Sequence, residues 1–386
     1  MSANDAVIVA AVRTPVGIGK PEKGVLSGVH PVDLSALVLN EVTARAGVDP
    51  ALVDDVIWGS VTQIGEQGGN VGRNAVLAAG FPEDVTAVSI DRQCGSSQQA
   101  VTFAAAAVIA GHSDVVIAGG VESMSRVPMF SSFVGGDGPY PASLHGRYEG
   151  GLVNQGISAE LIAARWGLSR SYLDEIAAAS HARAAAARDE GRFDEEIVGV
   201  ETAAGLVTQD QGIRPGTTVE SLAGLKTPFQ DGGVVTAGNA SQISDGAAAL
   251  LIMTSARASE LGLTPIARIH TVAMAGVDPI IMLTGPIPAT QRVLKKSGLS
   301  IDDIGAFEVN EAFASVLGAW YAETGADPER TNVNGGAIAL GHPLGASGAR
   351  LMTTLVHHLR RTGARYGLQT MCEGGGMANA TILERL

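Results

Sequence analysis

The chain contains two halves that repeat the same order of short motifs, and this repetition limits the folds that it can adopt. Cys94 and His342 each stand in a turn rich in Gly and Ser before an apolar helix, and they are 342 − 94 = 248 positions apart. Two aspartate pairs, at 54–55 and 302–303, show the same offset, 302 − 54 = 248. Because the motifs and the spacing agree, we predict a duplicated unit with a ligand site between its copies.

Apolar strands alternate with helices in both halves, which indicates a parallel or mixed layered α/β sheet. A region inserted within the first half is rich in loops and helices, and such insertions commonly carry binding residues. From residue 244 onward the Ala-rich run predicts a helix followed by a strand. We therefore expect three parts: a first half formed by residues 1–121 and 247–264, an inserted loop domain at 122–246, and a second half at 265–386.

The composition excludes several classes of partner. The 386 residues carry 26 Lys and Arg against 39 Asp and Glu, a net charge of −13. No basic run stands out, so we expect no nucleic acid and no membrane surface as partner. The N-terminus lacks the pattern of a signal peptide, and no apolar run is long enough to span a membrane. Only two cysteines are present, far apart in the chain. This usage predicts reduced thiols and a cytoplasmic location.

Cys94 lies where a short strand, 85–90, turns into an Ala-rich helix. The free amides at a helix start favour negative charge, so a thiol there is expected to have a lowered pKa and to serve as a nucleophile. The alternative is a small buried residue at a strand–helix junction, because free cysteines often lie in cores.

Three further polar residues are expected to meet Cys94 by the symmetry of the repeat. His342 is its counterpart in the second half, Cys372 follows a predicted strand, and Asn310 follows the strand that ends at Val309. A metal site built from two Cys and one His is an alternative, but the flanking glycine runs supply no other ligands and no C-x-x-C spacing. We therefore expect no metal.

Six motifs together resemble the thiolases over essentially the whole chain. They are Q-C-G-S-S (93–97), T-A-G-N-A-S (236–241), S-D-G-A-A-A (244–249), N-E-A-F-A (310–314), N-G-G-A-I-A-L-G-H-P-L-G-A-S-G (334–348) and C-E-G-G-G (372–376). The resemblance implies an α/β thiolase fold, with two duplicated halves layered αβαβα and an inserted lid-like loop domain. It also implies cleavage of a 3-oxoacyl-CoA by a second CoA, or the reverse Claisen condensation.

The resemblance also implies a role for each site residue. Cys94 would attack the 3-oxo carbonyl and carry the acyl group, and His342 would accept the thiol proton. Cys372 would protonate the departing acetyl-CoA carbanion and then deprotonate the incoming CoA. Asn310, with a water and His342, would stabilise the enolate, while the backbone amides of Cys94 and Gly374 would stabilise the tetrahedral adduct.

Coenzyme A and acetyl-CoA are implied as substrates, with no permanently bound cofactor. Ser241 and Ala237 match the segment along the pantetheine arm, Phe229 matches a residue that packs near it, and Arg214 matches the loop at the nucleotide end. From the residues alone, Ser241 could equally be a turn hydroxyl and Arg214 a solvated surface charge. The family also implies a homodimer or a homotetramer.

Some positions depart from the family pattern and bear on the acyl group. Short-chain biosynthetic thiolases have a His-Met pair where this chain has Asn154-Gln155. The motifs around Cys94, residues 283–290 and Cys372 look most like degradative thiolases of bacterial steroid and bulky-acyl catabolism. The loop 123–154 would then line the acyl pocket with Met124, Met129, Phe130, Phe133, Tyr140 and Tyr148.

Four alternatives stay open at this point. A short-chain acetoacetyl-CoA thiolase would use the same residues. A 3-oxoacyl synthase shares the scaffold but lacks the second cysteine, so Cys372 argues against it. An acyl-CoA or lipid carrier predicts a missing nucleophile, and a Cys–His–Asn hydrolase predicts release of a free acid.

Overall fold

The computed structural model describes residues 2, 4–148 and 151–386. The predicted loop 123–154 thus includes two residues, 149–150, that lie outside the described residues. Among the described residues, no helix combines the length and hydropathy that crossing a bilayer needs.

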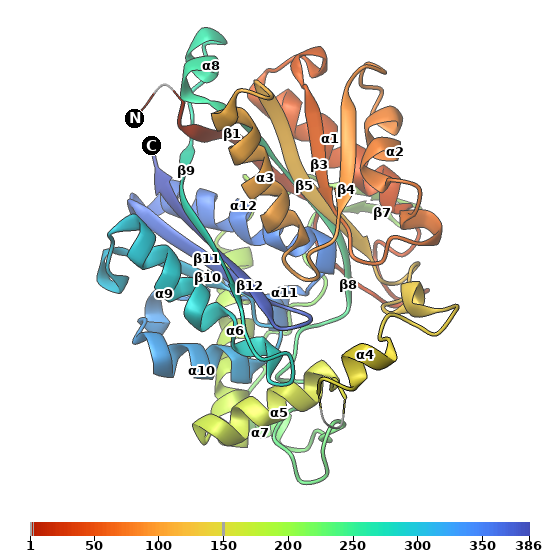
Figure 1. Ribbon diagram of the computed structural model, residues 1–386, viewed down its shortest axis with the longest axis vertical. Helices are drawn as coiled ribbons and strands as arrows, with labels where there is room; N and C mark the ends of the chain where they lie inside the picture. The colour runs from red at the N-terminus through yellow and green to blue at the C-terminus, as the bar shows by residue number, and fades with distance from the viewer. Residues whose placement is uncertain (1, 3, 149–150) are drawn as a thin grey trace.

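Strands make up the centre of the molecule (Figure 1). They are β1 (Ala6–Arg13), β2 (Gly17–Ile18), β3 (Asp55–Gly59), β4 (Thr86–Ile90), β5 (Val115–Ser123), β6 (Val200–Thr202), β7 (Gly205–Val207), β8 (Ser244–Thr254), β9 (Ala267–Gly276), β10 (Ala306–Val309), β11 (Tyr366–Glu373) and β12 (Met377–Arg385). β6 and β7 form a separate hairpin. The other described strands join in one mixed sheet in the order β10-β11-β12-β9-β1-β8-β5-β3-β4, with β2 beside β8.

The α-helices cover this sheet and build the region beside it. They are α1 (Pro31–Ala46), α2 (Val71–Ala78), α3 (Ser96–Ala110), α4 (Ala142–His145), α5 (Gln155–Trp166), α6 (Arg170–Asp189), α7 (Val219–Ala223), α8 (Ser255–Glu260), α9 (Pro286–Ser297), α10 (Ala314–Thr324), α11 (Ala337–Leu340) and α12 (Leu344–Thr362). Polar caps fix several starts: Asn154 accepts from the backbone of α5, and Ser169 accepts from that of α6.

The two halves of the sheet have the same topology. In the first half β3 runs parallel to β5, and β8 runs antiparallel to both β5 and β1. In the second half β10 runs parallel to β11, and β12 runs antiparallel to both β11 and β9. Asp55 faces Val116 in the first half, and Ala306 faces Gly367 in the second. The strands therefore repeat with an offset of 306 − 55 = 367 − 116 = 251.

Five layers follow from how the side chains are buried, which confirms the predicted layered α/β architecture (Figure 1). Helices α1 and α2 bury their apolar faces against the outer side of the first half-sheet. Helices α3 and α12 lie between the two half-sheets and share one apolar cluster with both. Helices α9 and α10 cover the far side of the second half-sheet. The central helical layer thus belongs to both halves.

Two sequence predictions about these elements were wrong. The Ala-rich run from residue 244 is one long strand, β8, with no helix before it, because both faces of β8 are buried and its small residues fit between neighbouring strands. The aspartate pairs are not equivalent either. The 3-10 turn η5 (Ile301–Asp303) corresponds to the 3-10 turn η1 (Pro50–Leu52), since 301 − 50 = 251. The aspartates at 302–303 therefore correspond to residues 51–52, and the first aspartate pair, at 54–55, lies three residues after that position. Cys94 and His342 keep their match, because each precedes a central helix by two residues.

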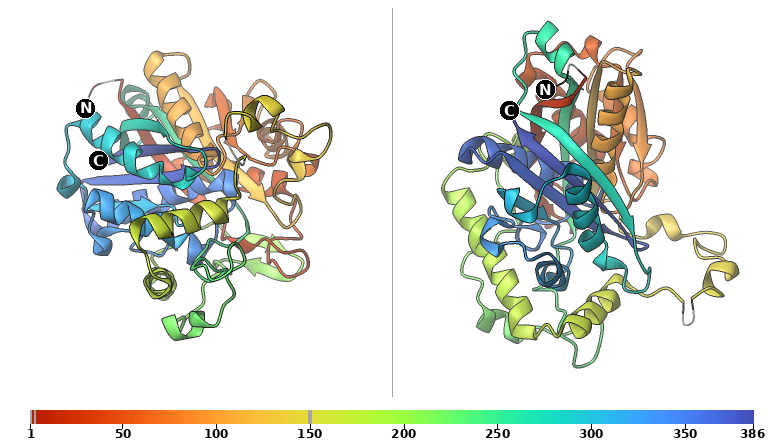
Figure 2. Two further views of the ribbon diagram at one scale, coloured as in Figure 1. Left: turned by 60° about the horizontal axis from the view of Figure 1, so that its bottom comes forward. Right: turned by 60° about the vertical axis from the view of Figure 1, so that its left-hand side comes forward.

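The region between β5 and β8 lies against one end of the sheets. Helices α5 and α6 pack beneath the second half, and the segment around α4 extends away from the main body (Figure 2). Aromatic rings in that segment form a row from Phe130 to Phe133 to Tyr140, with centroid separations of 5.4 and 6.0 Å.

Arg13 of β1 joins the sheet to the inserted region and should be important for stability. Its buried guanidinium pairs with Glu196 at 2.6 Å and with Asp210 at 2.8 Å. The Arg13→Ala variant leaves two buried carboxylates without their partner, so we expect it to lose about 3–5 kcal/mol of unfolding free energy in urea titrations. The control is Arg188→Ala, whose pair with Asp189 is partly exposed and contributes less than about 1 kcal/mol. Equal stability of the two variants would contradict this assignment.

Candidate active site

A tight turn between β4 and α3 holds Cys94. Gln93 adopts a left-handed conformation with φ of 49°, and its N–H donates to Asp91 Oδ1 at 2.6 Å. The hydroxyl of Ser96 accepts from the Arg92 N–H at 2.9 Å, which closes the turn. Cys94 is therefore fixed just before the helix and is only 5% exposed.

Backbone amides surround the Cys94 thiol, yet its pKa is not lowered as the helix start had led us to predict. The N–H groups of Cys94 and Gly374 donate toward the sulfur. Burial outweighs them and, with the charge of Glu373, raises the pKa of Cys94 to about 12. The prediction was wrong because it counted the helix start and not the loss of water. The resting thiol is protonated, so its attack needs a base.

His342 lies in a hydrogen-bond network that selects its tautomer. The Ser347 hydroxyl donates to the Pro343 carbonyl at 2.8 Å, so its oxygen accepts from His342 Nδ1 at 2.5 Å. On the other side, Asn310 Nδ2 lies 3.3 Å from His342 Nε2 and donates to it. This pattern assigns the ring proton to Nδ1 and leaves the lone pair of Nε2 as an acceptor.

The imidazole is also kept neutral. Burial, and then the positive charge of Arg350 on α12, lower the pKa of His342 to about 3. A neutral ring whose Nε2 carries a lone pair can accept a proton, which is the state that a general base requires.

Cys372 is buried near the end of β11 and belongs to the same site. Burial, and then the neighbouring Cys94, raise its pKa well above the usual value of a thiol. The two thiols are the free cysteines of the described chain, and both are buried. Cys372 is thus a protonated thiol at neutral pH and can donate a proton to a strong base.

Two adjoining hollows lie beside the turn that holds Cys94. Cys94 lines the smaller one, and Gly374 lines the larger one, of about 580 Å³. Side chains common to both connect them: Asp91, Gln93, Phe130, Phe133 and Gln155. The aromatic pair comes from the inserted region, so this region forms one wall of the space beside the thiols.

The residues predicted to contact coenzyme A divide into two groups. The N–H of Ser241 donates to the carbonyl of Ala312 at 2.9 Å, and the ring of Phe229 lies edge-to-face against Phe313 at 6.1 Å. Both therefore contact the segment that follows Asn310. Ala237 and Arg214 are exposed, and none of these four residues is among the described residues that line the two hollows.

Sequence reasoning missed the partners that orient the catalytic candidates. Ser347 lies five residues after His342, in the G-A-S-G motif, and only the turn before α12 brings its hydroxyl to the ring. Gln155, already noted in the sequence as a departure from the family pattern, lines both hollows from the start of α5. A polar residue inside a glycine-rich motif was the available signal for Ser347.

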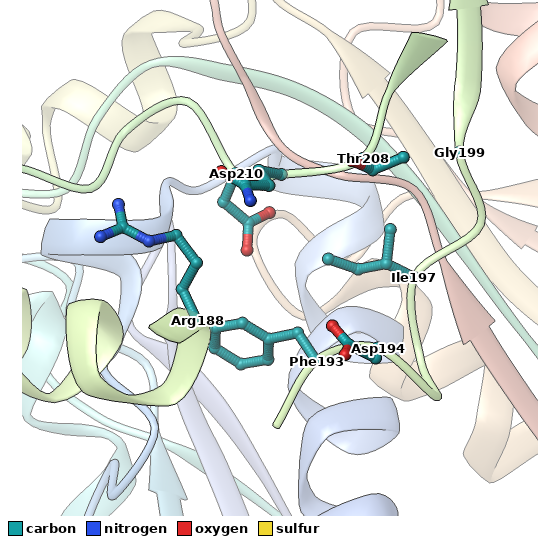
Figure 3. A pocket seen from close by; sticks show the side chains of 8 residues that line it. Arg188, Phe193, Asp194, Ile197, Gly199, Thr208 and Asp210 are labelled. Carbon is teal, nitrogen blue, oxygen red and sulfur yellow. The ribbon is translucent and has the colours of Figure 1, made fainter. Parts of the chain in front are cut away.

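A further hollow lies far from the thiols, against the inserted region (Figure 3). Phe193 and Asp210 line it, but the Asp210 carboxylate is already paired with Arg13 and also accepts from the Val16 N–H. None of the predicted site residues lines it. Among the described residues, no group of three or more His, Cys, Asp or Glu is placed to hold a metal.

A buried thiol faced by two backbone amides suits thioester formation, which defines the class of thiol-dependent acyltransferases. Family comparison narrows this class, and the chain belongs to the thiolase family. The family model of the thiolase N-terminal domain matches residues 6–256, and that of the C-terminal domain matches residues 263–385.

Individual relatives cover almost the whole chain. The steroid 3-ketoacyl-CoA thiolase FadA6 of Mycobacterium tuberculosis is 51% identical over 99% of this chain and 94% of its own length. A 3-ketoacyl-CoA thiolase of Bacillus subtilis is 42% identical over 98% of this chain and 99% of its own length. The crystal structure of the Bacillus anthracis acetyl-CoA acetyltransferase is 40% identical, covers 99% of both chains and superposes with a TM-score of 0.90. The thiolase fold is therefore shown.

Proposed function

We propose that this thiolase cleaves a 3-oxoacyl-CoA with a second CoA through an acyl-Cys94 intermediate, and catalyses the reverse condensation. The observation that carries the proposal is the presence of two buried thiols in one site, one of them facing two backbone amides. A single nucleophile would suffice for hydrolysis. Carbon–carbon cleavage also requires an acid for the carbanion, and Cys372 supplies it.

In the first step the Cys94 sulfur bonds to the 3-oxo carbon while His342 Nε2 takes the thiol proton. The N–H groups of Cys94 and Gly374 would stabilise the alkoxide that forms, and their donation toward the Cys94 sulfur supports this role. Collapse of the adduct breaks the bond between carbons 2 and 3 and leaves the acyl group on Cys94.

The electron pair of the broken bond stays with carbon 2 and forms the acetyl-CoA enolate. In the second step the Cys372 thiol protonates that carbon. His342, now carrying a proton on Nε2, and Asn310 Nδ2 are donors for the enolate oxygen; the two atoms lie 3.3 Å apart. The Cys372 thiolate then removes the proton from the incoming CoA. The CoA sulfur attacks the acyl carbon, the bond from that carbon to the Cys94 sulfur breaks, and the shortened acyl-CoA leaves. His342 Nε2 returns its proton to the Cys94 thiolate, which restores the resting enzyme.

For the CoA arm we propose Ser241, Ala237 and Phe229, with Arg214 at the nucleotide end. Ser241 and Phe229 contact the segment that follows Asn310, and this contact supports the assignment. Arg214 is exposed and free to meet a phosphate. No permanently bound cofactor is required by this scheme.

For the acyl group we propose a bulky, ring-bearing chain. The hollow beside Gly374 has about 580 Å³ and is walled by Phe130, Phe133 and Tyr140. The relative from Mycobacterium tuberculosis is named a steroid thiolase. Asn154 and Gln155 line this hollow, at the positions where short-chain biosynthetic thiolases have a His-Met pair.

The test is the release of acetyl-CoA from a panel of 3-oxoacyl-CoAs, from acetoacetyl-CoA to ring-bearing acids, with CoA added. We expect kcat/KM to rise by at least about tenfold from the shortest to the ring-bearing substrate, because additional apolar area is buried. A preference for acetoacetyl-CoA would favour the short-chain alternative. A free acid as product would favour a hydrolase. CoA-independent decarboxylation of a malonyl thioester would favour a 3-oxoacyl synthase, and binding without turnover would favour a carrier.

We also propose that the protein is a homodimer, or a dimer of dimers, formed along the edge of β4. β4 ends the sheet, and Val88 on it, with Phe103 and Ile109 on the neighbouring α3, is exposed. An apolar edge strand of this kind pairs readily with another chain. We expect Val88→Asp to shift the mass in light scattering to that of a monomer. The control is Leu206→Asp, because Leu206 on β7 is an exposed apolar residue away from this edge; it should leave the mass unchanged.

Two other expectations are kept as proposals. The described thiols carry no disulfide, so we propose a reducing, cytoplasmic location. We also retain the division into residues 1–121 with 247–264, 122–246 and 265–386 as functional units. Limited proteolysis that cuts first within 122–246 would support this division.

A further inference from the structure

The duplicated fold places two glutamates at equivalent positions. Glu122 is the last but one residue of β5 and lies opposite Gly246, and Glu373 ends β11 opposite Met377. The offset is 373 − 122 = 251, the same as for the rest of the repeated strands. Each glutamate points toward the start of the central helix of the other half, Glu122 toward α12 and Glu373 toward α3.

Glu122 is fully engaged. Its carboxylate accepts from the N–H groups of Val61, Thr62 and Gly345 at 2.9, 3.1 and 2.8 Å, and from Gln67 Nε2 at 2.7 Å. Four donors compensate for the loss of water, so Glu122 joins the two halves as a structural group.

Glu373 occupies the equivalent position with neither oxygen bonded. The side chain is fully buried, and both oxygens lack a hydrogen-bond partner among the described residues. Its Oε1 lies only 1.9 Å from where a Cβ on Gly95 would stand, so the carboxyl fills the space beside the residue that follows Cys94. A buried carboxylate without donors is costly, so this group favours the neutral acid.

We propose that Glu373 is a positioning residue for Cys94 that acts through charge: as a neutral acid it permits negative charge to develop at Cys94, and as a carboxylate it opposes that charge. The catalytic consequence rests on the proposed acyl-Cys94 route. Ionisation releases one proton to solvent and breaks no other bond.

The charged and titratable groups that face Glu373 are few. Asp91 and Arg92 face it from the turn before α3, and the thiols of Cys94 and Cys372 face it from that turn and from β11. Burial raises the pKa of Glu373 to about 8, Arg92 opposes this rise, and Asp91 adds to it. The carboxyl therefore loses its proton as the pH rises through about 8, and above that pH it hinders formation of the Cys94 thiolate.

The test compares Glu373→Gln, which keeps the shape and cannot ionise, with the wild type. The rate of Cys94 alkylation by iodoacetamide is read from the Cys94 peptide by mass spectrometry between about pH 6.5 and about pH 9.5. The ratio of the variant rate to the wild-type rate cancels the titration of Cys94 that both proteins share. We expect a ratio near one at the acid end and a rise of about tenfold at the alkaline end.

A second variant guards against a purely structural effect. Arg92→Gln removes the charge that opposes the rise in the Glu373 pKa. In this variant, the decrease in Cys94 reactivity that Glu373 ionisation causes should therefore begin at a higher pH than in the wild type. A ratio that stays constant with pH, or an Arg92→Gln profile that superposes on the wild type, overturns the proposal. Because alkylation requires no substrate, a missing acyl-Cys94 species after addition of acyl-CoA would contradict the proposed function separately.

Discussion

Replacement of Cys94 by serine is expected to eliminate the acyl-enzyme and to lower thiolysis by a factor on the order of 10⁴ or more. The hydroxyl of serine is a much weaker acid than a thiol, and the site already raises the pKa of Cys94 to about 12. A neutral imidazole whose pKa is about 3 cannot remove the proton of a serine efficiently. The measurement is the mass of the intact protein after mixing with acyl-CoA, together with the rate of acetyl-CoA release.

The matched control for this experiment is Ser97→Ala. Ser97 lies on the first turn of α3, and its hydroxyl accepts from the Ala349 N–H at 2.9 Å, so it contributes to packing between the central helices. This variant should still form the acyl-enzyme. Normal turnover by Cys94→Ser would exclude Cys94 as the acyl carrier.

The Cys372→Ala variant is expected to separate the two halves of the reaction. Acylation of Cys94 by a preformed acyl-CoA should persist, because the CoA thiolate, with a thiol pKa of about 8.5, leaves without an acid. Thiolysis and condensation should fall by a factor on the order of 10² to 10⁴, because the acetyl-CoA carbanion is a far stronger base and needs a proton donor. Intact-protein mass reports the first reaction, and acetyl-CoA release reports the second.

Exchange of deuterium into acetyl-CoA gives an independent measure of the same role. The wild type should exchange the methyl protons in deuterated buffer, and Cys372→Ala should not. Equal loss of acylation and of exchange would instead mean that the alanine disturbs the whole site, and retention of both would exclude Cys372 as the acid.

The arrangement of the halves could be predicted from the sequence because turns before central helices have distinctive residues. Cys94 and His342 were paired correctly, since each precedes its helix by two residues. The match between the aspartate pairs was wrong by three positions. Charged residues near a short turn can stand at different positions in the two copies without changing the buried strand that follows. The Ala-rich strand β8 was mistaken in part for a helix, because alanine favours helices and only burial on both faces selects the strand.

The electrostatics of the site could not be predicted in the same way. The direction of the Cys94 pKa depends on how completely α3, β11 and the inserted region exclude water, and no local motif encodes that quantity. The tautomer of His342 depends on Ser347 and Asn310, which are brought together by α12 and β10. The role of Glu373 is visible only beside Glu122, once the strand registers are known.

The shared central layer separates reactivity from selectivity. Cys94 and His342 stand at the heads of α3 and α12, which pack against each other and against both half-sheets in one apolar cluster. The hollow proposed to hold the acyl group is instead lined in part by a peripheral segment that extends away from that cluster (Figure 2). On the proposed function, exchange of Phe130, Phe133 or Tyr140 is expected to change the accepted acyl group while the reaction geometry stays constant, which would make this chain a scaffold for engineering condensations of unusual acids.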